Sequence, residues 1–368
     1  MKVIVMHEVM APHDGVGNDI EPMIDLLSKQ YEVCAYAYDR KNPRLPYVTE
    51  KELLSLIADT KNLIIYHHSV YWPDGEALLK KAKCPIIFRY HNITPPKFFD
   101  PYSENHYYSC MVGQKQTKQL QKEFPKAHWI CCSKYNARDL IYLSKDQIHV
   151  VPCFAPGRLE DWGNTTPDAG VVKKLRDFDG VNILFVGRVV PNKGYHTMLE
   201  VLYYYVKQYG PKVKLRVIGK KDENLQEYTD FVETRMKELG VTEQIEFTGE
   251  VTDATLSAYY QESDVMLCVS EHEGFCIPVV EAQYFGLPVI ALDASAVPET
   301  LGKDQMILSK DPKKIAVAIH VVASSKHQPG GAYETLVAQG HKNYQERFTL
   351  EKISEDFLAA FHDCIAPK

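Results

Sequence analysis

Short runs that are apolar at nearly every position are the feature of this chain that most constrains its fold. They are rich in valine, isoleucine and phenylalanine, and longer segments with helical periodicity separate them. Continuous apolar runs indicate strands covered on both faces, and strands separated by helices indicate parallel sheets. The expected strands span residues 2–6, 32–36, 63–66, 85–90, 128–132 and 148–151, then 182–186, 214–218, 245–247, 265–269 and 289–292. The sequence therefore predicts an α/β protein with two doubly wound, Rossmann-like sheets.

A stretch rich in proline and glycine divides the two sets of strands. Residues 152–180 have little periodicity, which is typical of a linker, and a new strand begins at Asn182. The length of 368 residues also fits two domains, at roughly 150 residues per domain. We expect a first domain at residues 1–165 and a second at 175–348. Ligands of such sheets bind beyond the carboxyl ends of the strands, so facing sheets would place the site in an interdomain cleft.

Charge and cysteine usage exclude several classes of protein. The net charge is -6, which argues against a broad nucleic-acid surface. The nine cysteines include no Cys-x-x-Cys pair and are scattered through apparent strands, so we expect reduced core thiols and no metal site.

No apolar run approaches the roughly 18 residues that a membrane helix needs. We therefore expect a cytoplasmic protein.

The first segment that carries chemistry follows the strand at 182–186. Gly187 ends this strand, and two cations, Arg188 and Lys193, lie in the turn before a helix predicted from Tyr195. A helix N-terminus combined with two fixed cations suits a diphosphate group. The alternative interpretation is an ordinary strand–turn–helix with solvated cations.

The second segment, Ser270 to Ala282, follows the strand at 265–269. Pro278 suits the first turn of a helix, which would place Glu281 in that turn and Glu273 in the loop before it. Carboxylates at such positions can accept hydrogen bonds from sugar or ribose hydroxyls. The alternative makes Glu281 a surface acid and Glu273 a solvated loop charge, although the apolar residues after Gly274 argue against a purely solvated loop.

These two segments, followed by Gly286-x-Pro288-Val289-Ile290 and Val297-Pro298-Glu299, resemble retaining glycosyltransferase family 4, which has the GT-B fold. The resemblance extends over residues 181–302, and the sequence around His272 is similar to that of bacterial polysaccharide-assembly members. It implies a nucleotide-sugar donor site made by these residues: Gly15, Gly17, Gly187, Arg188, Lys193, Gly219, Val251, Glu273, Gly274, Phe275, Cys276, Ile277 and Glu281.

The resemblance also implies a role for individual side chains. Arg188 and Lys193 would neutralise the donor diphosphate, Glu273 would bind donor-sugar hydroxyls, and Glu281 would hold the ribose. Cys276 stands where the family usually has glycine, so its side chain would narrow the sugar pocket. Base recognition in the family relies on main chain, here around Gly219 and Val251, so the side chains leave UDP-sugars and GDP-mannose both open.

The loop Asp14-Gly15-Val16-Gly17-Asn18 after the first strand has two interpretations. It could bring backbone close to a phosphate, or it could be half of a dinucleotide fingerprint for NAD. The NAD interpretation is weak, because Ile20 occupies the third glycine position and a long loop precedes Gly15. The resemblance places Gly15 and Gly17 beside the donor phosphates and the acceptor.

His91 follows the strand at 85–90. A single histidine is more often structural than catalytic, but the carboxyl end of a parallel strand is where ligands bind, which favours a functional role. By resemblance, His91 faces the donor sugar and joins Arg188, Lys193 and Glu273 as the catalytic set. Asn92 and Thr94 would shape the acceptor side.

Taken together, the resemblance implies a metal-independent, retaining transfer of a hexose from a UDP-sugar or GDP-mannose to a hydroxyl acceptor. The expected acceptor is a growing polysaccharide or a lipid-linked glycan, and no cofactor or metal ion is expected. The amphipathic segment 350–368 would pack back on the first domain. The alternatives are a catalytically silent scaffold of the same fold, another nucleotide-sugar enzyme such as an epimerase, a phosphorylase, or an NAD oxidoreductase.

Two weaker signals complete the sequence. Asp177-Phe178-Asp179 has the form of a manganese motif, but it precedes a strand and is expected to be surface acid. Lys115, Lys118 and Lys122 share one helical stripe that could contact anionic lipid at about 1 kcal/mol per charge, which would hold the protein at the inner face of a membrane. A solvated helix face is the favoured interpretation of these lysines.

Overall fold

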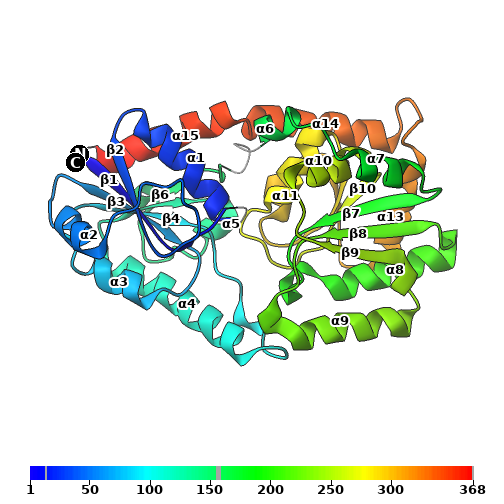
Figure 1. Ribbon diagram of the computed structural model, residues 1–368, viewed down its shortest axis with the longest axis horizontal. Coiled ribbons are helices and arrows are strands. Elements are labelled where there is room, and N and C mark those ends of the chain that lie inside the picture. Colours follow the sequence, from blue (N-terminus) through cyan, green and yellow to red (C-terminus); the bar gives the residue numbers. More distant parts are fainter. Residues whose placement is uncertain (13–14, 155–158, 367–368) are drawn as a thin grey trace. The chain divides into compact units, whose positions relative to one another are not determined.

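A computed structural model describes residues 1–12, 15–154 and 159–366 (Figure 1). Asp14 and residues 155–158 of the expected linker lie outside the described residues. The chain divides into two compact units. The first contains Met1–Pro96, Asn105–Arg158 and Thr349–Lys368, and the second contains Lys97–Glu104 and Leu159–Phe348.

The first unit contains a six-stranded parallel sheet in the order β2-β1-β3-β4-β5-β6. Its strands are β1 (Lys2–Met10), β2 (Glu32–Arg40), β3 (Leu63–His68), β4 (Ile86–Tyr90), β5 (His128–Cys131) and β6 (Ile148–Val150). Its helices are α1 (Gly17–Ser28), α2 (Glu50–Ile57), α3 (Pro73–Leu79), α4 (Glu104–Glu123), α5 (Lys134–Ala137) and α15 (Leu350–Ile365). The strand order reverses between β1 and β3, which is the topological switch point where doubly wound sheets bind ligands.

Helices cover both faces of this sheet. In Figure 1, α1 and α15 lie on one side of the first sheet, and α2, α3 and α4 lie on the other. The capping box that the sequence shows at Thr49 and Glu52 is present at the start of α2, with Glu52 accepting from the Thr49 backbone at 2.7 Å. Such a cap contributes about 1 kcal/mol, because it satisfies amide groups that the helix leaves without partners.

The last helix of the chain belongs to the first unit. The apolar face of α15 buries Ile353, Phe357 and Phe361, and the Phe357 ring packs edge-on against Phe154 with 5.2 Å between centroids. This amphipathic pattern was readable in the sequence because the apolar residues recur at helical spacing.

The second unit contains another six-stranded parallel sheet, in the order β12-β11-β10-β7-β8-β9. Its strands are β7 (Val181–Val186), β8 (Val213–Ile218), β9 (Ile245–Gly249), β10 (Val265–Cys268), β11 (Val289–Leu292) and β12 (Met306–Leu308). Its helices are α6 (Leu159–Gly163), α7 (Ala169–Arg176), α8 (Tyr195–Tyr209), α9 (Gln226–Leu239), α10 (Asp253–Glu262), α11 (Ile277–Phe285), α12 (Val297–Leu301), α13 (Pro312–Ser324) and α14 (Ala332–Arg347).

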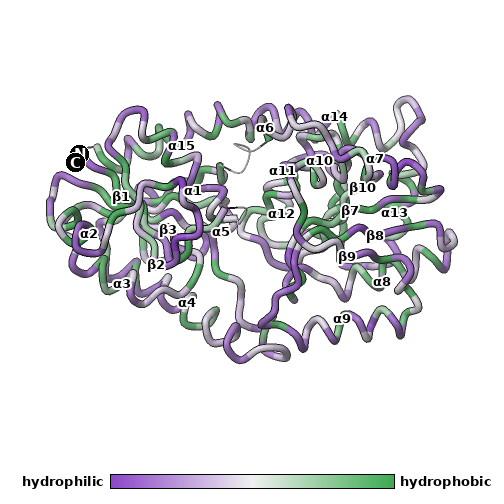
Figure 2. Tube along the Cα trace, viewed as in Figure 1, coloured by the Kyte–Doolittle hydropathy of each residue, from purple (hydrophilic) through white to green (hydrophobic). Residues whose placement is uncertain are grey.

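The predicted α/β class and all eleven predicted strands are confirmed. The twelfth strand, β12, was not predicted, because it is short, partly buried and at the edge of its sheet. Within the second unit, α8 and α9 cover one face, and α7, α10 and α14 cover the other (Figure 1). Along α9, hydrophilic and hydrophobic residues alternate, as expected for a helix with one buried face (Figure 2).

Two segments differ from the sequence-based division of the chain. The expected linker contains α6 and α7, and α7 begins at an N-cap in which Asp168 accepts from Gly170 and Val171. Residues 97–104 belong to the second unit, where Tyr102 packs against Tyr228 with 4.8 Å between ring centroids. Their short, aperiodic sequence carries no signal for this packing. Among the described residues, none of the helices combines the length and the apolar character needed to cross a membrane.

Candidate functional site

The conformation of the loop after β7 depends on a glycine, and any other residue at this position would strain the backbone. Gly194 has φ 75°, and a Cβ built on it would lie 2.2 Å from the carbonyl oxygen of Val269. Only glycine permits this close approach between the turn and the end of β10. The turn therefore brings Lys193, just before Gly194, next to the loop that follows β10.

Lys193 and Glu273 form a shielded ion pair in the second unit. The Lys193 Nζ lies 2.6 Å from Glu273 Oε1, and the two side chains are 18% and 12% exposed. Burial alone would lower the pKa of Lys193, but the Glu273 carboxylate and its hydrogen bond outweigh burial and raise that pKa. The structure thus joins two predicted residues from separate segments into one charged centre at the carboxyl ends of β7 and β10.

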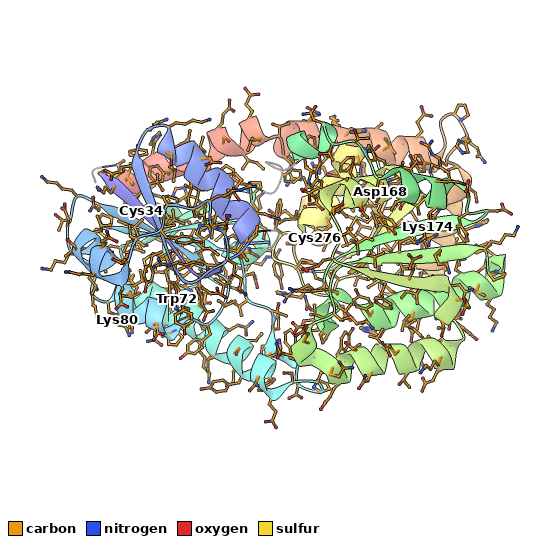
Figure 3. All side chains as sticks on the ribbon, viewed as in Figure 1. Cys34, Trp72, Lys80, Asp168, Lys174 and Cys276 are labelled. Atoms are coloured by element: carbon orange, nitrogen blue, oxygen red, sulfur yellow. The ribbon has the colours of Figure 1, made fainter. Side chains whose placement is uncertain are left out.

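The backbone of the Glu273 loop is also fixed. Its amide donates to Ser295 Oγ at 2.8 Å, and the loop ends at Cys276, which precedes α11 (Figure 3). Cys276 has φ 76°, a left-handed conformation that costs a non-glycine residue about 1–2 kcal/mol. The usual glycine of the resembled family suits this conformation, and the N-terminal end of α11 directs its positive dipole toward the loop.

Glu281 is neither in the first turn of α11 nor on the surface, so the predicted position was wrong. It is the fifth residue of α11 and is 6% exposed. Tyr260 Oη donates to Glu281 Oε2 at 2.5 Å. The helix starts at Ile277 with Pro278 in its second position, which moves Glu281 beyond the first turn and against α10.

Arg188 is not joined to the Lys193–Glu273 pair. Its side chain is 62% exposed, and its Nη1 lies 3.6 Å from Asp222 Oδ2. Nearby, the ends of β7, β8 and β9 come close through main chain. A Cβ on Gly219 would lie 2.4 Å from the Gly187 carbonyl oxygen, and the Gly219 amide donates to Gly249 at 2.9 Å. Because these residues are glycines, main-chain atoms and not side chains line this edge of the sheet.

In the first unit, His91 directly follows β4, one strand beyond the switch point, and is held by partners on several elements. Its Nε2 lies 2.9 Å from His67 Nδ1 on β3 and 3.5 Å from Asp19 Oδ2 on α1. Its Nδ1 lies 3.5 Å from the Cys132 sulfur after β5. Both ring nitrogens therefore have partners within the first unit, so His91 could bind a sugar only by exchanging one of them.

A buried ion pair supports this histidine. Arg89 donates from Nε and Nη2 to the two Asp19 oxygens at 2.8 and 3.0 Å, and both side chains are fully buried. Burial would raise the pKa of Asp19, but the Arg89 guanidinium holds it well below its usual range. Burial would likewise raise the pKa of Cys132, but hydrogen bonding with Cys153 and the charges of Arg89 and His91 hold it well below its ordinary value.

The sequence analysis did not single out Asp19, His67, Arg89 or Cys132. One signal could have found them, because Arg89 stands inside an otherwise apolar strand. A buried charge requires a buried partner, so this position predicts a carboxylate nearby without naming which one.

The other predicted residues of the first unit are placed as follows. Gly17 is the first residue of α1, and a Cβ on Gly15 would meet no atom within 4 Å, so no contact within the described chain requires glycine there. Asn92 has φ 77°, and its amide donates to Asn136 and Asp139 at 3.1 and 3.3 Å, which gives it a structural role in the loop. Thr94 is half-buried.

The lysine stripe lies on α4. Lys115, Lys118 and Lys122 are exposed, and Lys122 Nζ lies 4.3 Å from the centroid of the Tyr142 ring. These contacts agree with a solvated helix face and leave membrane contact as a prediction.

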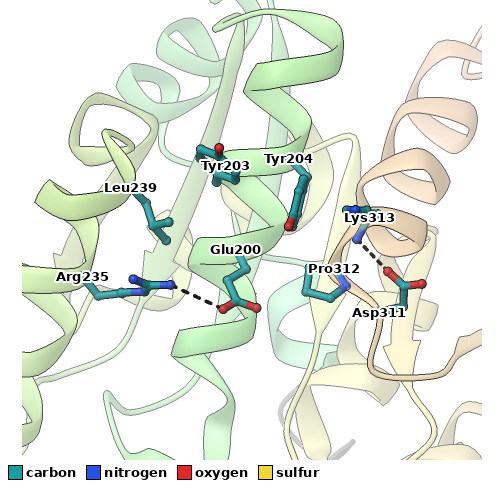
Figure 4. Close-up of a pocket in the computed structure, with 8 residues that line it drawn as sticks. All are labelled: Glu200, Tyr203, Tyr204, Arg235, Leu239, Asp311, Pro312 and Lys313. Atoms are coloured by element: carbon teal, nitrogen blue, oxygen red, sulfur yellow. Dashed lines mark hydrogen bonds and ion pairs between the residues drawn. The ribbon is translucent and has the colours of Figure 1, made fainter.

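A pocket of about 330 Å³ lies apart from these residues, among α8, α9 and the start of α13 (Figure 4). Within it, Arg235 Nη2 lies 3.6 Å from Glu200 Oε1, and Lys313 Nζ lies 5.2 Å from the centroid of the Tyr204 ring. It contains none of the predicted site residues, so we do not assign the donor to it.

The buried histidines predict a pH dependence of stability. Burial lowers the pKa of His7 from 6.5 to about 4. The folded protein then keeps His7 neutral while the unfolded chain binds a proton, so stability falls as the pH drops from about 6.5 toward 4. At pH 5, the proton that His7 binds only in the unfolded chain lowers the free energy of unfolding by about 2 kcal/mol.

We therefore expect a His7→Gln substitution to lessen the loss of unfolding free energy between pH 7 and pH 5 by about 2 kcal/mol, measured by urea unfolding. His327→Gln, at an exposed position, serves as the control for replacing a histidine by glutamine. An unaltered pH dependence in the His7 variant would contradict a neutral buried ring.

Comparison with known families concerns the second unit. Residues 172–334 match the family model described as glycosyl transferases group 1. Mannosylfructose-phosphate synthase of Agrobacterium fabrum is 25% identical over 59% of this chain and 48% of its own length. An MMP alpha-(1->4)-mannosyltransferase of Mycolicibacterium hassiacum is 24% identical over 68% of this chain and 56% of its own length. The chain thus spans about half the length of these curated relatives.

Solved structures share the fold. HepE of Anabaena, determined with UDP-glucose, aligns with a TM-score of 0.74 at 16% identity, covering 98% of this chain and 99% of its own. WaaG, a glycosyltransferase involved in lipopolysaccharide biosynthesis, aligns with a TM-score of 0.70 at 13% identity, covering 99% and 100%. These likenesses show the two Rossmann-like domains of the GT-B fold.

Proposed function

We propose, from the glycosyl transferases group 1 domain at residues 172–334, that this protein is a glycosyltransferase that uses a nucleotide diphosphate sugar. The finer part of the proposal is that it transfers a hexose to a hydroxyl acceptor with retention and without a metal ion. The observation that carries it is the shielded Lys193–Glu273 pair at the carboxyl ends of β7 and β10.

The charges of this pair suit a departing diphosphate. Breaking the bond between the anomeric carbon and phosphate builds negative charge on the diphosphate and makes the sugar ring oxocarbenium-like. Lys193, already held by Gly194 and Glu273, would stabilise that charge with little reorganisation. Arg188 is exposed, so its long side chain would turn from Asp222 to the diphosphate when the donor binds.

The carboxylates would orient the donor. Glu273 would keep Lys193 with one oxygen and accept a sugar hydroxyl with the other, which converts orientation into rate. Glu281, with one oxygen held by Tyr260, would accept a ribose hydroxyl. His91 would contact the sugar by exchanging His67 for it, while the donor phosphate takes the proton of the acceptor hydroxyl.

The names of relatives support two donor classes. HepE was determined with UDP-glucose, and a relative in Mycolicibacterium smegmatis is a GDP-mannose-dependent alpha-mannosyltransferase that is 29% identical over 50% of this chain and 48% of its own length. For the acceptor we propose a growing polysaccharide or a lipid-linked glycan at the cytoplasmic side of a membrane.

A thermal-shift panel in excess EDTA tests the donor site and its independence of metal. The ligands are UDP, GDP, ADP and their common hexose conjugates. One nucleotide family is expected to stabilise the protein by about 2.7 kcal/mol at a concentration of 100 Kd, with the same shift when Mg²⁺ or Mn²⁺ replaces EDTA. No shift with any nucleotide, on protein shown to be folded, would contradict the donor proposal. A shift that requires the metal would contradict only its metal-independent part.

A further inference from the structure

Three potential metal ligands meet in the first unit, away from His91. His128 begins β5, His149 lies in β6, and Cys364 lies in the last turns of α15. The strands are neighbours, with Ile130 opposite His149. Because strand side chains alternate between faces, His128 shares a face with Ile130 and therefore with His149. The ligand atoms of the two histidines and Cys364 all lie within 4.8 Å of one another.

We propose that His128, His149 and Cys364 form a site for a thiophilic divalent cation of the zinc class, with Asp363 as a fourth ligand. The cation would fasten the last helix of the chain to the edge of the first sheet. This site is independent of the proposed glycosyl transfer.

The distances fit tetrahedral zinc. His128 Nδ1 lies 3.4 Å from His149 Nε2, which in turn lies 3.5 Å from Asp363 Oδ2. With Zn–N and Zn–O bonds of about 2.0–2.1 Å and a tetrahedral angle, two such ligand atoms stand about 3.3–3.4 Å apart. The two histidine nitrogens therefore already stand at the separation that the ion requires, and the Asp363 carboxylate and the Cys364 thiol would close around it by side-chain rotation.

The donor set and its exposure also fit. Imidazole, thiolate and carboxylate are the ligands that zinc takes in proteins, and four of them close a structural site. The His149 side chain is 17% exposed and the Asp363 side chain is 66% exposed, so an ion can arrive from solvent. His128 is 7% exposed and gives the site a rigid inner side.

The comparable cluster around His91 is less suitable for a cation. His91, Cys132 and Cys153 also lie within 4.8 Å of one another. However, the Arg89 guanidinium interacts electrostatically with both cysteines, and its fixed positive charge opposes a second cation there. By contrast, His149 Nε2 lies 3.5 Å from the Asp363 carboxylate, whose negative charge favours a cation.

The site could not be found from ligand spacing. Its residues come from two strands and from a helix at the other end of the sequence, whereas the spacings that mark zinc sites place pairs of ligands within a few residues. Because the ion would bind the folded chain and not the unfolded one, it should stabilise the protein in proportion to the logarithm of its concentration.

Cobalt substitution tests the proposal on the full chain, first stripped with EDTA and free of a histidine tag. We expect one Co²⁺ per chain, with the visible bands of a tetrahedral site and a near-ultraviolet thiolate-to-cobalt band, both displaced by Zn²⁺. Zn²⁺ should also raise the melting temperature, and EDTA should reverse the rise.

Variants assign the ligands. Cys364→Ser should lose the thiolate band, and His149→Asn should weaken Co²⁺ binding at least tenfold, while Cys34→Ser, a half-buried thiol outside the cluster, should behave as the wild type. Two results would overturn the proposal. One is a wild-type protein without a thiolate–cobalt band, which leaves only hydrogen bonds among these side chains. The other is a band that persists in Cys364→Ser but disappears in Cys153→Ser.

Discussion

Lys193→Ala is expected to reduce turnover about 10²–10³-fold, because it removes the fixed charge that, in the proposed mechanism, stabilises the departing diphosphate. The Lys193 Nζ is held 2.6 Å from Glu273 and is largely shielded from water. A charge in such a shielded position acts more strongly than a charge at the surface. The measurement is release of nucleoside diphosphate from the donor that the thermal-shift panel identifies. Lys193→Arg should recover part of the activity, since it keeps the charge but changes its geometry.

The matched control is Lys221→Ala. Lys221 follows β8 at the same edge of the sheet, but its Nζ pairs with Glu233 at 2.6 Å and its side chain is 42% exposed. Turnover of this variant should stay close to that of the wild type, because Lys221 takes part in no step of the proposed mechanism and its surface ion pair contributes only about 0–1 kcal/mol to folding stability. A Lys193→Ala protein that folds and turns over at nearly the wild-type rate would remove this residue from the proposed mechanism.

Arg89→Met is expected to destabilise the first unit by about 3–5 kcal/mol, because it leaves the buried Asp19 carboxylate without its cation. Arg89 also donates to the carbonyl oxygens of Val151 and Pro152, both at 2.8 Å. Asp19 in turn accepts from the Phe154 amide at 2.7 Å, so the pair fixes the chain after β6. Urea unfolding followed by the signal of the first unit measures the loss.

Two further variants separate the pair from general disruption of the core. The double variant Asp19→Leu with Arg89→Met should recover much of the stability, because an apolar pair leaves no buried charge. Lys2→Met breaks a pair whose side chains are 43% and 67% exposed, so it should cost at most about 1 kcal/mol. Equal losses of unfolding free energy from Arg89→Met and Lys2→Met would show that the buried pair contributes no more to stability than the exposed pair.

The Arg89→Met variant should also change the acid response. With Arg89 present, the pKa of Asp19 is held well below its usual range, so the charged pair stabilises the fold at neutral pH and loses this contribution only in strong acid. Without Arg89, burial raises that pKa, so the variant should recover part of its lost stability as the pH falls.

The sequence by itself determined the fold class and the location of the charged loops. Eleven strands were readable because a strand buried on both faces must be apolar at nearly every position, which is a local property. Lys193 and Glu273 could be placed near strand ends for the same reason, since the loop that carries each of them directly follows such a run. The start of α2 was readable because a capping box spans only four residues.

Only the tertiary structure decided which of these residues meet. The Lys193–Glu273 pair and the Asp19–Arg89 pair join segments far apart in the sequence, and no local pattern specifies such contacts. Glu281 was expected in the first turn of α11 and is buried against Tyr260, because its position depends on where the helix starts and on packing with α10. The meeting of Cys364 with His128 and His149 depends in the same way on the return of α15 to the first sheet. Hydrophobic periodicity reflects the environment of a single helix or strand. A site depends instead on which helices and strands the fold brings into contact.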